Sequence, residues 1–97
     1  MKTVEECQID PVYCQIKEST IQTINDYVVQ GLPPGGFVTA VLANDLMGAL
    51  GRADLENRLS IWAICNYVYN EIGCSLHGSY EAVEKHLKEV HERISAD

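Results

Sequence analysis

Two arginines are the residues of this chain best suited to bind an anion. Arg52 and Arg58 are the only Lys or Arg side chains between Lys17 and Lys85, in a chain of formal net charge -7. The planar guanidinium group donates paired hydrogen bonds to phosphate oxygens and stays charged when it is partly desolvated. Arg58 also falls in the first turns of a predicted helix, where the helix dipole adds positive charge. This pattern predicts a phosphate site.

Neighbouring polar and aromatic residues could contact the rest of such a ligand. Asn44 interrupts the apolar face of a predicted helix, and Asn57 lies beside Arg58. Their amide groups both donate and accept hydrogen bonds, as a base or a ribose requires. The aromatic side chains that could stack on a base are Phe37, Trp62 and Tyr69. The competing interpretation is that both arginines form salt bridges, locally or across a subunit interface, with Asp45, Asp54 or Glu56.

The glycine-rich stretch LPPGGF, residues 32–37, leaves two interpretations open. It precedes a predicted helix, so its amides could face an anion. It matches neither the phosphate loop, which continues with G-K-S/T, nor the G-x-G-x-x-G fingerprint. A tight turn between two helices is the simpler interpretation.

Other chemistries find weaker support in the residue spacing. Cys74 and His77 form one C-x2-H pair, but a closed zinc site usually needs two such pairs. Glu71 could join them around one turn as a thiol-based catalytic group, yet no pattern places the three side chains together. The sequence therefore predicts no metal ligand, no catalytic residue and no cofactor, and we expect a protein that is not an enzyme.

Length and charge limit the class of protein. Ninety-seven residues make one domain with a thin core, and short chains often gain stability by forming homo-oligomers. With 46% hydrophobic residues but a single Trp and a single Phe, the core is predicted to be aliphatic. A net charge of -7 disfavours binding to DNA, RNA or an anionic membrane surface. Without an apparent signal peptide or membrane span, we expect a cytoplasmic protein whose cysteines are thiols.

Hydrophobic periodicity predicts an all-α fold, a small bundle of about four helices. Ser19 and Asp54 are predicted N-caps, and Gly31 is a predicted helix stop. Residues 1–18 are polar and weakly patterned, and they are expected to be loose or ordered only by docking on a single helical domain, residues 19–97. The four helices are predicted over residues 19–30, 37–50, 55–72 and 80–95.

The third predicted helix carries two apolar stripes rather than one. Such a helix lies at the centre of a fold or at a subunit interface. The first stripe consists of Leu55, Leu59, Trp62, Cys65, Tyr69 and Ile72, and the second of Ile61, Ile64 and Val68.

The run GLPPGGFVTAVLANDLMGALGRADLENRLSIWAICNYVYNEI, followed by HGSYEAVEKHL, resembles a group of short, mostly uncharacterised phage and prophage proteins. The resemblance implies a phage origin, and hence the cytoplasm of a bacterial host, but no activity. Some small phage proteins without catalytic motifs act as oligomeric sponges. They enclose cyclic nucleotide or cyclic ADP-ribose-type immune signals without cleaving them, and this chain is similar in size.

Two functions from different classes follow from these observations. In the first, a homo-oligomer sequesters a small phosphate-bearing nucleotide in pockets between subunits. The residues predicted to line those pockets are Arg52, Arg58, Asn44, Asn57, Phe37 and Tyr69. In the second, the chain is a protein–protein interaction module that inhibits or adapts a host protein and binds no small ligand. The spare apolar face of the third helix would then dock the partner.

Overall fold

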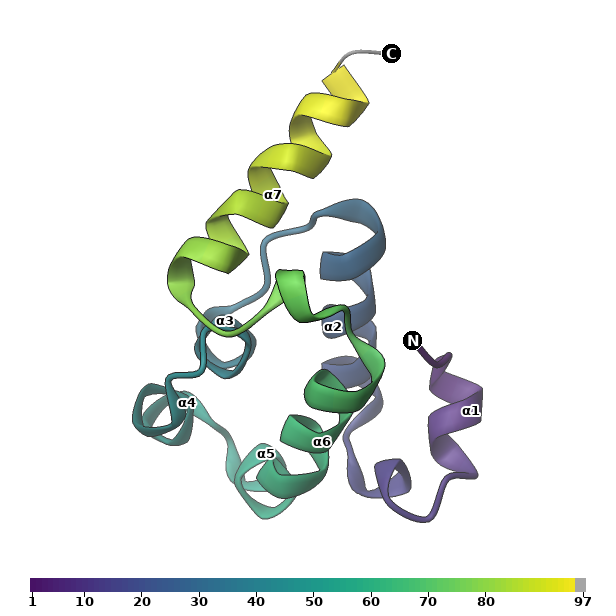
Figure 1. Ribbon diagram of the computed structural model, residues 1–97. Helices are drawn as coiled ribbons and strands as arrows, with labels where there is room; N and C mark the ends of the chain where they lie inside the picture. The colour runs from purple at the N-terminus through teal and green to yellow at the C-terminus, as the bar shows by residue number, and fades with distance from the viewer. Residues whose placement is uncertain (96–97) are drawn as a thin grey trace.

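The computed structural model describes residues 1–95, and every regular element within them is helical (Figure 1). The all-α prediction is confirmed for this part of the chain, and the count of about four helices is wrong. The predicted domain, residues 19–97, ends with two residues that lie outside the described part. The elements are, in order, α1 (Val4–Gln8), η1 (Tyr13–Gln15), α2 (Glu18–Gln30), α3 (Gly36–Leu42), α4 (Leu46–Arg52), α5 (Leu55–Leu59), α6 (Ile61–Glu71), η2 (Cys74–Leu76) and α7 (Tyr80–Ser95), where η denotes a 3-10 helix.

The predicted helix over residues 37–50 is two helices, α3 and α4, because Asn44 ends the first of them. Asn44 has a φ of 62°, a left-handed conformation that Asn adopts more easily than most residues. Its N–H donates to the Val41 carbonyl at 3.1 Å, and the Asp45 N–H donates to the Ala40 carbonyl at 2.8 Å. These two hydrogen bonds are typical of a helix that ends with a left-handed residue.

Asp45 then begins α4 as its N-cap. Its carboxylate accepts a hydrogen bond from the Gly48 N–H at 2.9 Å and another from the Tyr80 hydroxyl at 2.6 Å. These bonds, the one from Tyr80 above all, lower the pKa of Asp45. A Cβ at position 48 would collide with the Asp45 carboxylate, which explains Gly48. Asn44, which interrupts the apolar face of the predicted helix, is thus the stop signal of α3, and Asp45 is the start signal of α4.

The predicted helix over residues 55–72 is likewise divided, at Ser60, into α5 and α6. Asp54 caps α5 as predicted, since its carboxylate accepts from the Asn57 N–H at 2.8 Å. The Ser60 hydroxyl donates to the Glu56 carbonyl at 2.8 Å, a local bond that bends helices. The Ser60 N–H also donates to Glu56, and the Ile64 N–H donates to Ser60. Ser60 therefore ends α5 and begins α6.

Two tyrosines occupy the centre of the core, so the prediction of an aliphatic core was wrong. Tyr27 and Tyr67 are fully buried beside Ile24, Leu42 and Ile64. Burial raises the pKa of each tyrosine to about 12. Both hydroxyls have partners: that of Tyr27 donates to the Leu76 carbonyl at 2.7 Å, while that of Tyr67 lies in a polar network. Aromatic side chains can be buried in this way because a polar tip finds its partner.

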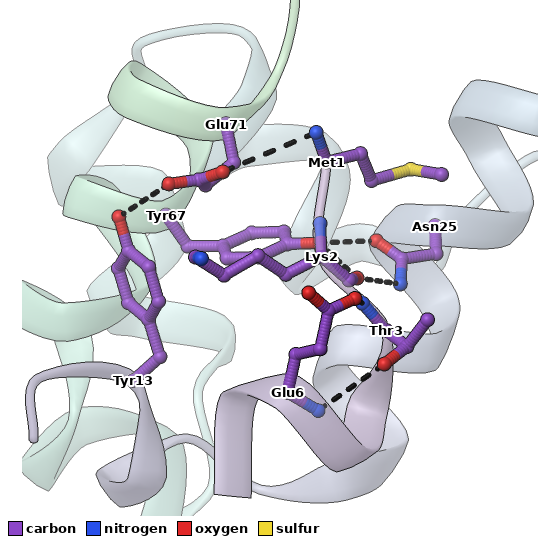
Figure 2. A network of polar contacts seen from close by, with 8 residues as sticks. All are labelled: Met1, Lys2, Thr3, Glu6, Tyr13, Asn25, Tyr67 and Glu71. Carbon is purple, nitrogen blue, oxygen red and sulfur yellow. Dashed lines mark hydrogen bonds and ion pairs between the residues drawn. The ribbon is translucent and has the colours of Figure 1, made fainter. Parts of the chain in front are cut away.

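Residues 1–18 form α1 and η1, which pack against α2 and α6. Figure 2 shows the network that joins them. The Tyr67 hydroxyl lies 2.6 Å from Asn25 Oδ1, and the Asn25 amide donates to the Lys2 carbonyl at 2.9 Å. The Tyr13 hydroxyl donates to the Glu71 carboxylate at 3.2 Å, and the ring of Tyr13 meets the ring of Tyr67 edge-on. Residues 1–18 thus carry two short helices that contact α2 and α6.

The last helix, α7, packs across the end of α2. Gly31 closes α2 in the predicted left-handed conformation, with a φ of 64°. A Cβ at Gly31 would lie 2.7 Å from the Val90 side chain, so the two helices approach closely here. His86 is buried, and its Nε2 lies 2.8 Å from the Tyr27 carbonyl. Figure 1 shows the C-terminal turns of α7 projecting past the other helices.

Candidate ligand-binding hollow

One hollow lies between the end of α3, the outer face of α6 and the loop before α7. Its volume is about 570 Å³, which falls in the range of small-ligand sites. We call it the main hollow. Helix α6 contributes Trp62, Cys65, Asn66, Val68 and Tyr69, and the other two segments contribute Val41, Leu42, Asn44, His77 and Gly78.

The α6 wall displays two aromatic side chains. Trp62, Cys65, Asn66 and Tyr69 follow the spacing i, i+3, i+4, i+7, which puts them on one face of the helix. Trp62 is 66% exposed and Tyr69 is 78% exposed, so their ring faces are open to a ligand. Asn66 lies between the two rings, with its amide donating to the Trp62 carbonyl at 2.9 Å. Its side-chain oxygen accepts a long hydrogen bond from the Asn70 amide, at 3.5 Å.

The opposite wall is held rigidly against α3. The Gly78 N–H donates to the Leu42 carbonyl at 2.7 Å, and the buried Tyr27 hydroxyl binds the Leu76 carbonyl. These bonds fix the backbone on both sides of His77. The Nε2 atom of His77 is buried and has no hydrogen-bond partner within the described residues. An unpaired buried polar atom costs about 1–3 kcal/mol, so this nitrogen is available for a ligand.

The main hollow suits a flat ring with polar edges. Aromatic faces stack on a heteroaromatic ring, and the polar groups around them offer donors and acceptors to its edge. The lining residues include no Asp, Glu, Lys or Arg. The main hollow can therefore recognise a ring, but by itself it supplies no charge to bind a phosphate.

A second hollow, of about 330 Å³, lies between the start of α2, the start of α3 and the end of α4. Arg52 lines it, with a guanidinium N–H donating to the Gly48 carbonyl at 3.2 Å. Lys17 lines it too, but its ammonium lies 2.5 Å from the Asp54 carboxylate. This bond raises the pKa of Lys17 and lowers that of Asp54. Arg52 therefore lines the second hollow with no carboxylate of residues 1–95 within 4.0 Å of it.

The predicted site residues are divided between these hollows within one chain. Asn44 and Tyr69 line the main hollow, whereas Arg52, Phe37 and Asn57 line the second. Asn57 is buried, and its side-chain oxygen accepts from the Thr20 hydroxyl at 2.7 Å, so it connects α5 to α2.

Arg58 lines neither hollow and is exposed on α5. Neither Arg58 nor Arg52 lies within 4.0 Å of a carboxylate in residues 1–95, so the predicted local salt bridges with Asp45, Asp54 or Glu56 do not form. One chain alone therefore does not bring the two arginines to one site.

His77 and Asn66 line the main hollow but were not among the predicted site residues. The spacing of His77 favoured a pair with Cys74, yet no hydrogen bond joins those two side chains in the described residues. The spacing of Trp62, Asn66 and Tyr69 on one helical face was the available signal for Asn66. No sequence signal places His77 opposite that face, because its position depends on the contact between its loop and α3.

Three further findings bear on function. Within residues 1–95, no group of three or more His, Cys, Asp or Glu side chains is close enough to hold a metal ion. None of the helices described here has the length and hydrophobicity needed to cross a bilayer. No protein-family model, curated protein or solved structure matches this chain.

Proposed function

We propose that this protein binds a nucleotide and holds its base in the main hollow. One observation carries the proposal: two exposed aromatic rings, Trp62 and Tyr69, stand across a hollow from a buried ring nitrogen of His77 that has no partner. Base stacking on an aromatic side chain contributes about 1–3 kcal/mol per base. The amides of Asn44 and Asn66 would contact the edge of the base.

The role we propose is sequestration without chemistry. The main hollow offers stacking and hydrogen bonding, and no Asp, Glu, Lys or Arg lines it. By analogy with the small phage proteins that act as sponges, to which this chain is similar in size, the proposed ligand is a cyclic nucleotide or a cyclic ADP-ribose-type immune signal. A protein that binds such a signal tightly would lower its free concentration in an infected cell.

Calorimetry against a panel of cyclic mono-, di- and trinucleotides, cyclic ADP-ribose isomers and the matching nucleosides tests this function. We expect at least one nucleotide to bind with micromolar or better affinity. Tyr69→Ala should weaken it about 10- to 100-fold, the loss of one stacking contact. Ile94→Ala, at an exposed apolar residue on α7 far along the chain, is the matched control and should change nothing.

Trp62 gives an independent readout, because it is the only tryptophan of the chain. A base stacked in the main hollow should quench its fluorescence, and the quenching curve should give the same affinity as calorimetry. If no panel member binds in the micromolar range by either method, the proposal fails for these ligands.

A second candidate function is a protein–protein interaction module. The observation that favours it is the exposure of Leu55 and Leu59 on α5, at 69% and 77%, next to Trp62. A host protein captured in stoichiometric amount, with no excess absorbance near 260 nm in the purified protein, would favour this function. Excess absorbance that heating releases would favour the nucleotide.

A further inference from the structure

The second hollow differs from the main hollow in charge. Two cations, Lys17 and Arg52, and one carboxylate, Asp54, line it, so its charged side chains sum to +1 in a chain of net charge -7. No Asp, Glu, Lys or Arg lines the main hollow, and the two hollows share no lining residue. The second hollow is thus a separate, locally positive site, with a volume of about 330 Å³ near the lower end of the range for small ligands.

Arg52 keeps most of its hydrogen-bond donors free. One guanidinium N–H donates to the Gly48 carbonyl at 3.2 Å, and no carboxylate of residues 1–95 lies within 4.0 Å of the group. Its side chain lies against the start of α3, because a Cβ at Gly36 would be 2.9 Å from Arg52 Cδ and 3.3 Å from Nε. The absence of a side chain at Gly36 therefore gives Arg52 its place in the second hollow.

The second free donor is the side-chain amide of Asn57, a residue that is only 8% exposed. Its oxygen accepts from the Thr20 hydroxyl at 2.7 Å, which holds the amide in place. Its nitrogen has no hydrogen-bond partner within residues 1–95, and protein atoms do not enclose it completely. Since Asn57 lines the second hollow, this hollow is where the amide N–H groups can find an acceptor.

Helix α2 adds positive charge at the same place. Its first turn lines the second hollow, and no side chain caps its N-terminus. The N-terminus of a 13-residue helix carries a partial positive charge from the helix dipole. The one carboxylate of the lining, Asp54, already bonds to the Lys17 ammonium at 2.5 Å, which offsets its negative charge.

We infer that the second hollow binds a phosphate group, with the Arg52 guanidinium and the Asn57 amide as its hydrogen-bond donors. These donors come from different helices, α4 and α5, and the N-terminus of α2 is a third side. A phosphate group suits this arrangement because its oxygens point in several directions, whereas those of a carboxylate lie in one plane. The site goes beyond the proposed function and does not depend on it.

NMR of the labelled side chains tests the site directly, with inorganic phosphate and ribose 5-phosphate as probes at constant ionic strength. The Arg52 Nε–H signal and the Asn57 side-chain amide signals should shift together and saturate, with a Kd of about 1 mM or lower for at least one probe. Ribose without phosphate should shift neither. Shifts that do not saturate, or saturation that leaves these two side chains unmoved, overturn the inference.

Two arginine variants separate a built site from general attraction of anions. Arg52→Ala should weaken the probe about tenfold or more, the loss of a charge-assisted hydrogen bond. Arg58→Ala is the matched control, because it removes the same charge from an exposed residue that lines neither hollow. It should leave the Kd unchanged. Equal losses in the two variants would mean that net charge alone attracts phosphate, and the inference would be wrong.

Gly36→Ala tests the placement of Arg52 without changing any charge. The added methyl group takes the space of the Arg52 side chain, so phosphate should bind severalfold more weakly. Gly51→Ala, next to Arg52 in the sequence, adds a methyl group where no atom lies within 4 Å, and it should change nothing. An unchanged Kd in Gly36→Ala overturns the inferred placement of Arg52.

The nucleotide panel identifies the source of the phosphate group. If Arg52→Ala weakens nucleotides but not the matching nucleosides, the phosphate belongs to the nucleotide. If it weakens only inorganic phosphate or ribose 5-phosphate, the ligand is a separate phosphate compound. Phosphate binding by a chain that binds no panel member preserves this inference and refutes the proposed function. Nucleotide binding by a chain whose second hollow takes no phosphate refutes this inference and preserves the proposed function.

Discussion

Two tyrosines of α6, only two residues apart, lie in opposite environments. Tyr67 is fully buried, and its hydroxyl bonds to Asn25 and Lys2 across the docked N-terminal segment. Tyr69 is 78% exposed beside the main hollow and makes no side-chain hydrogen bond with residues 1–95. Helix α6 therefore has a buried face and an exposed face. The buried face stabilises the fold, and the exposed face is available for binding.

The two faces of α6 differ more clearly in whether the polar groups near them have hydrogen-bond partners than in hydrophobicity. Around Tyr67 the polar groups of Tyr13, Asn25 and Glu71 have partners inside the chain (Figure 2). Across the main hollow the buried Nε2 of His77 has none within the described residues. Folding alone explains the first arrangement. The second leaves a cost that a ligand would remove.

Removing each tyrosine side chain gives the largest expected contrast. Tyr67→Ala should lower the free energy of unfolding by about 3–5 kcal/mol, because it leaves a cavity in the core. Tyr69→Ala should change it by less than about 0.5 kcal/mol, as is usual at an exposed site. Urea denaturation of the two variants and the wild type measures both values.

Tyr67→Phe covers the case in which Tyr67→Ala does not fold. It removes only the hydroxyl, and the partners left unpaired should cost about 1–2 kcal/mol. Equal effects at positions 67 and 69 would mean that both sides of α6 stabilise the fold, and the comparison would fail.

Alkaline pH should destabilise the buried side specifically. Burial raises the pKa of Tyr67 from 10.0 to about 12. Between these values the unfolded chain loses the proton and the folded chain keeps it, so stability falls as pH rises through this window. The loss for Tyr67 should be about 2 kcal/mol by pH 12.

Tyr67→Phe should remove that part of the pH dependence, and Tyr27→Phe should remove a similar part, since the pKa of Tyr27 is also raised to about 12. Urea denaturation at pH 8 and pH 11 compares the variants with the wild type. An unchanged slope in Tyr67→Phe would show that Tyr67 ionises as easily in the folded chain as in the unfolded one.

Asn44 contributes both to the fold and to the main hollow, because its backbone ends α3 and its side chain lines the hollow. Asn44→Ala should cost about 1 kcal/mol, the strain of a left-handed Ala. Asn44→Gly should preserve stability, because glycine adopts this conformation freely. Both variants should weaken nucleotide binding to the same extent, since each lacks the amide. Full binding by either variant would show that the Asn44 side chain has only a structural role.

The sequence predicted those elements of the fold that depend on local interactions. Periodicity gave the helical class, and the caps at Asp54 and Gly31 have the predicted geometry. The divisions at Asn44 and Ser60 were missed because apolar spacing continues across both interruptions. A left-handed Asn and a hydroxyl that bonds back to its own helix alter the backbone without altering that spacing.

The site was harder to predict because it depends on contacts between distant segments. The main hollow depends on two hydrogen bonds that hold the loop around His77. The Gly78 N–H donates to the Leu42 carbonyl, and the Tyr27 hydroxyl donates to the Leu76 carbonyl. Charge distribution favoured the arginines, but in one chain Arg58 lies outside both hollows. The spacing of charges along the sequence does not show which of them face a hollow.

The substitution with the smallest expected change in stability is at His77, and it tests most directly whether the exposed face of α6 binds a ligand. His77→Phe removes the buried Nε2 and keeps a flat ring of similar size, so stability should stay within about 1 kcal/mol or increase slightly. If the nitrogen exists to bind a base, the same substitution should weaken nucleotide binding about tenfold. Urea denaturation and calorimetry on one preparation give both numbers. A variant that loses stability but keeps its affinity would show that His77 supports the loop and does not contact the ligand.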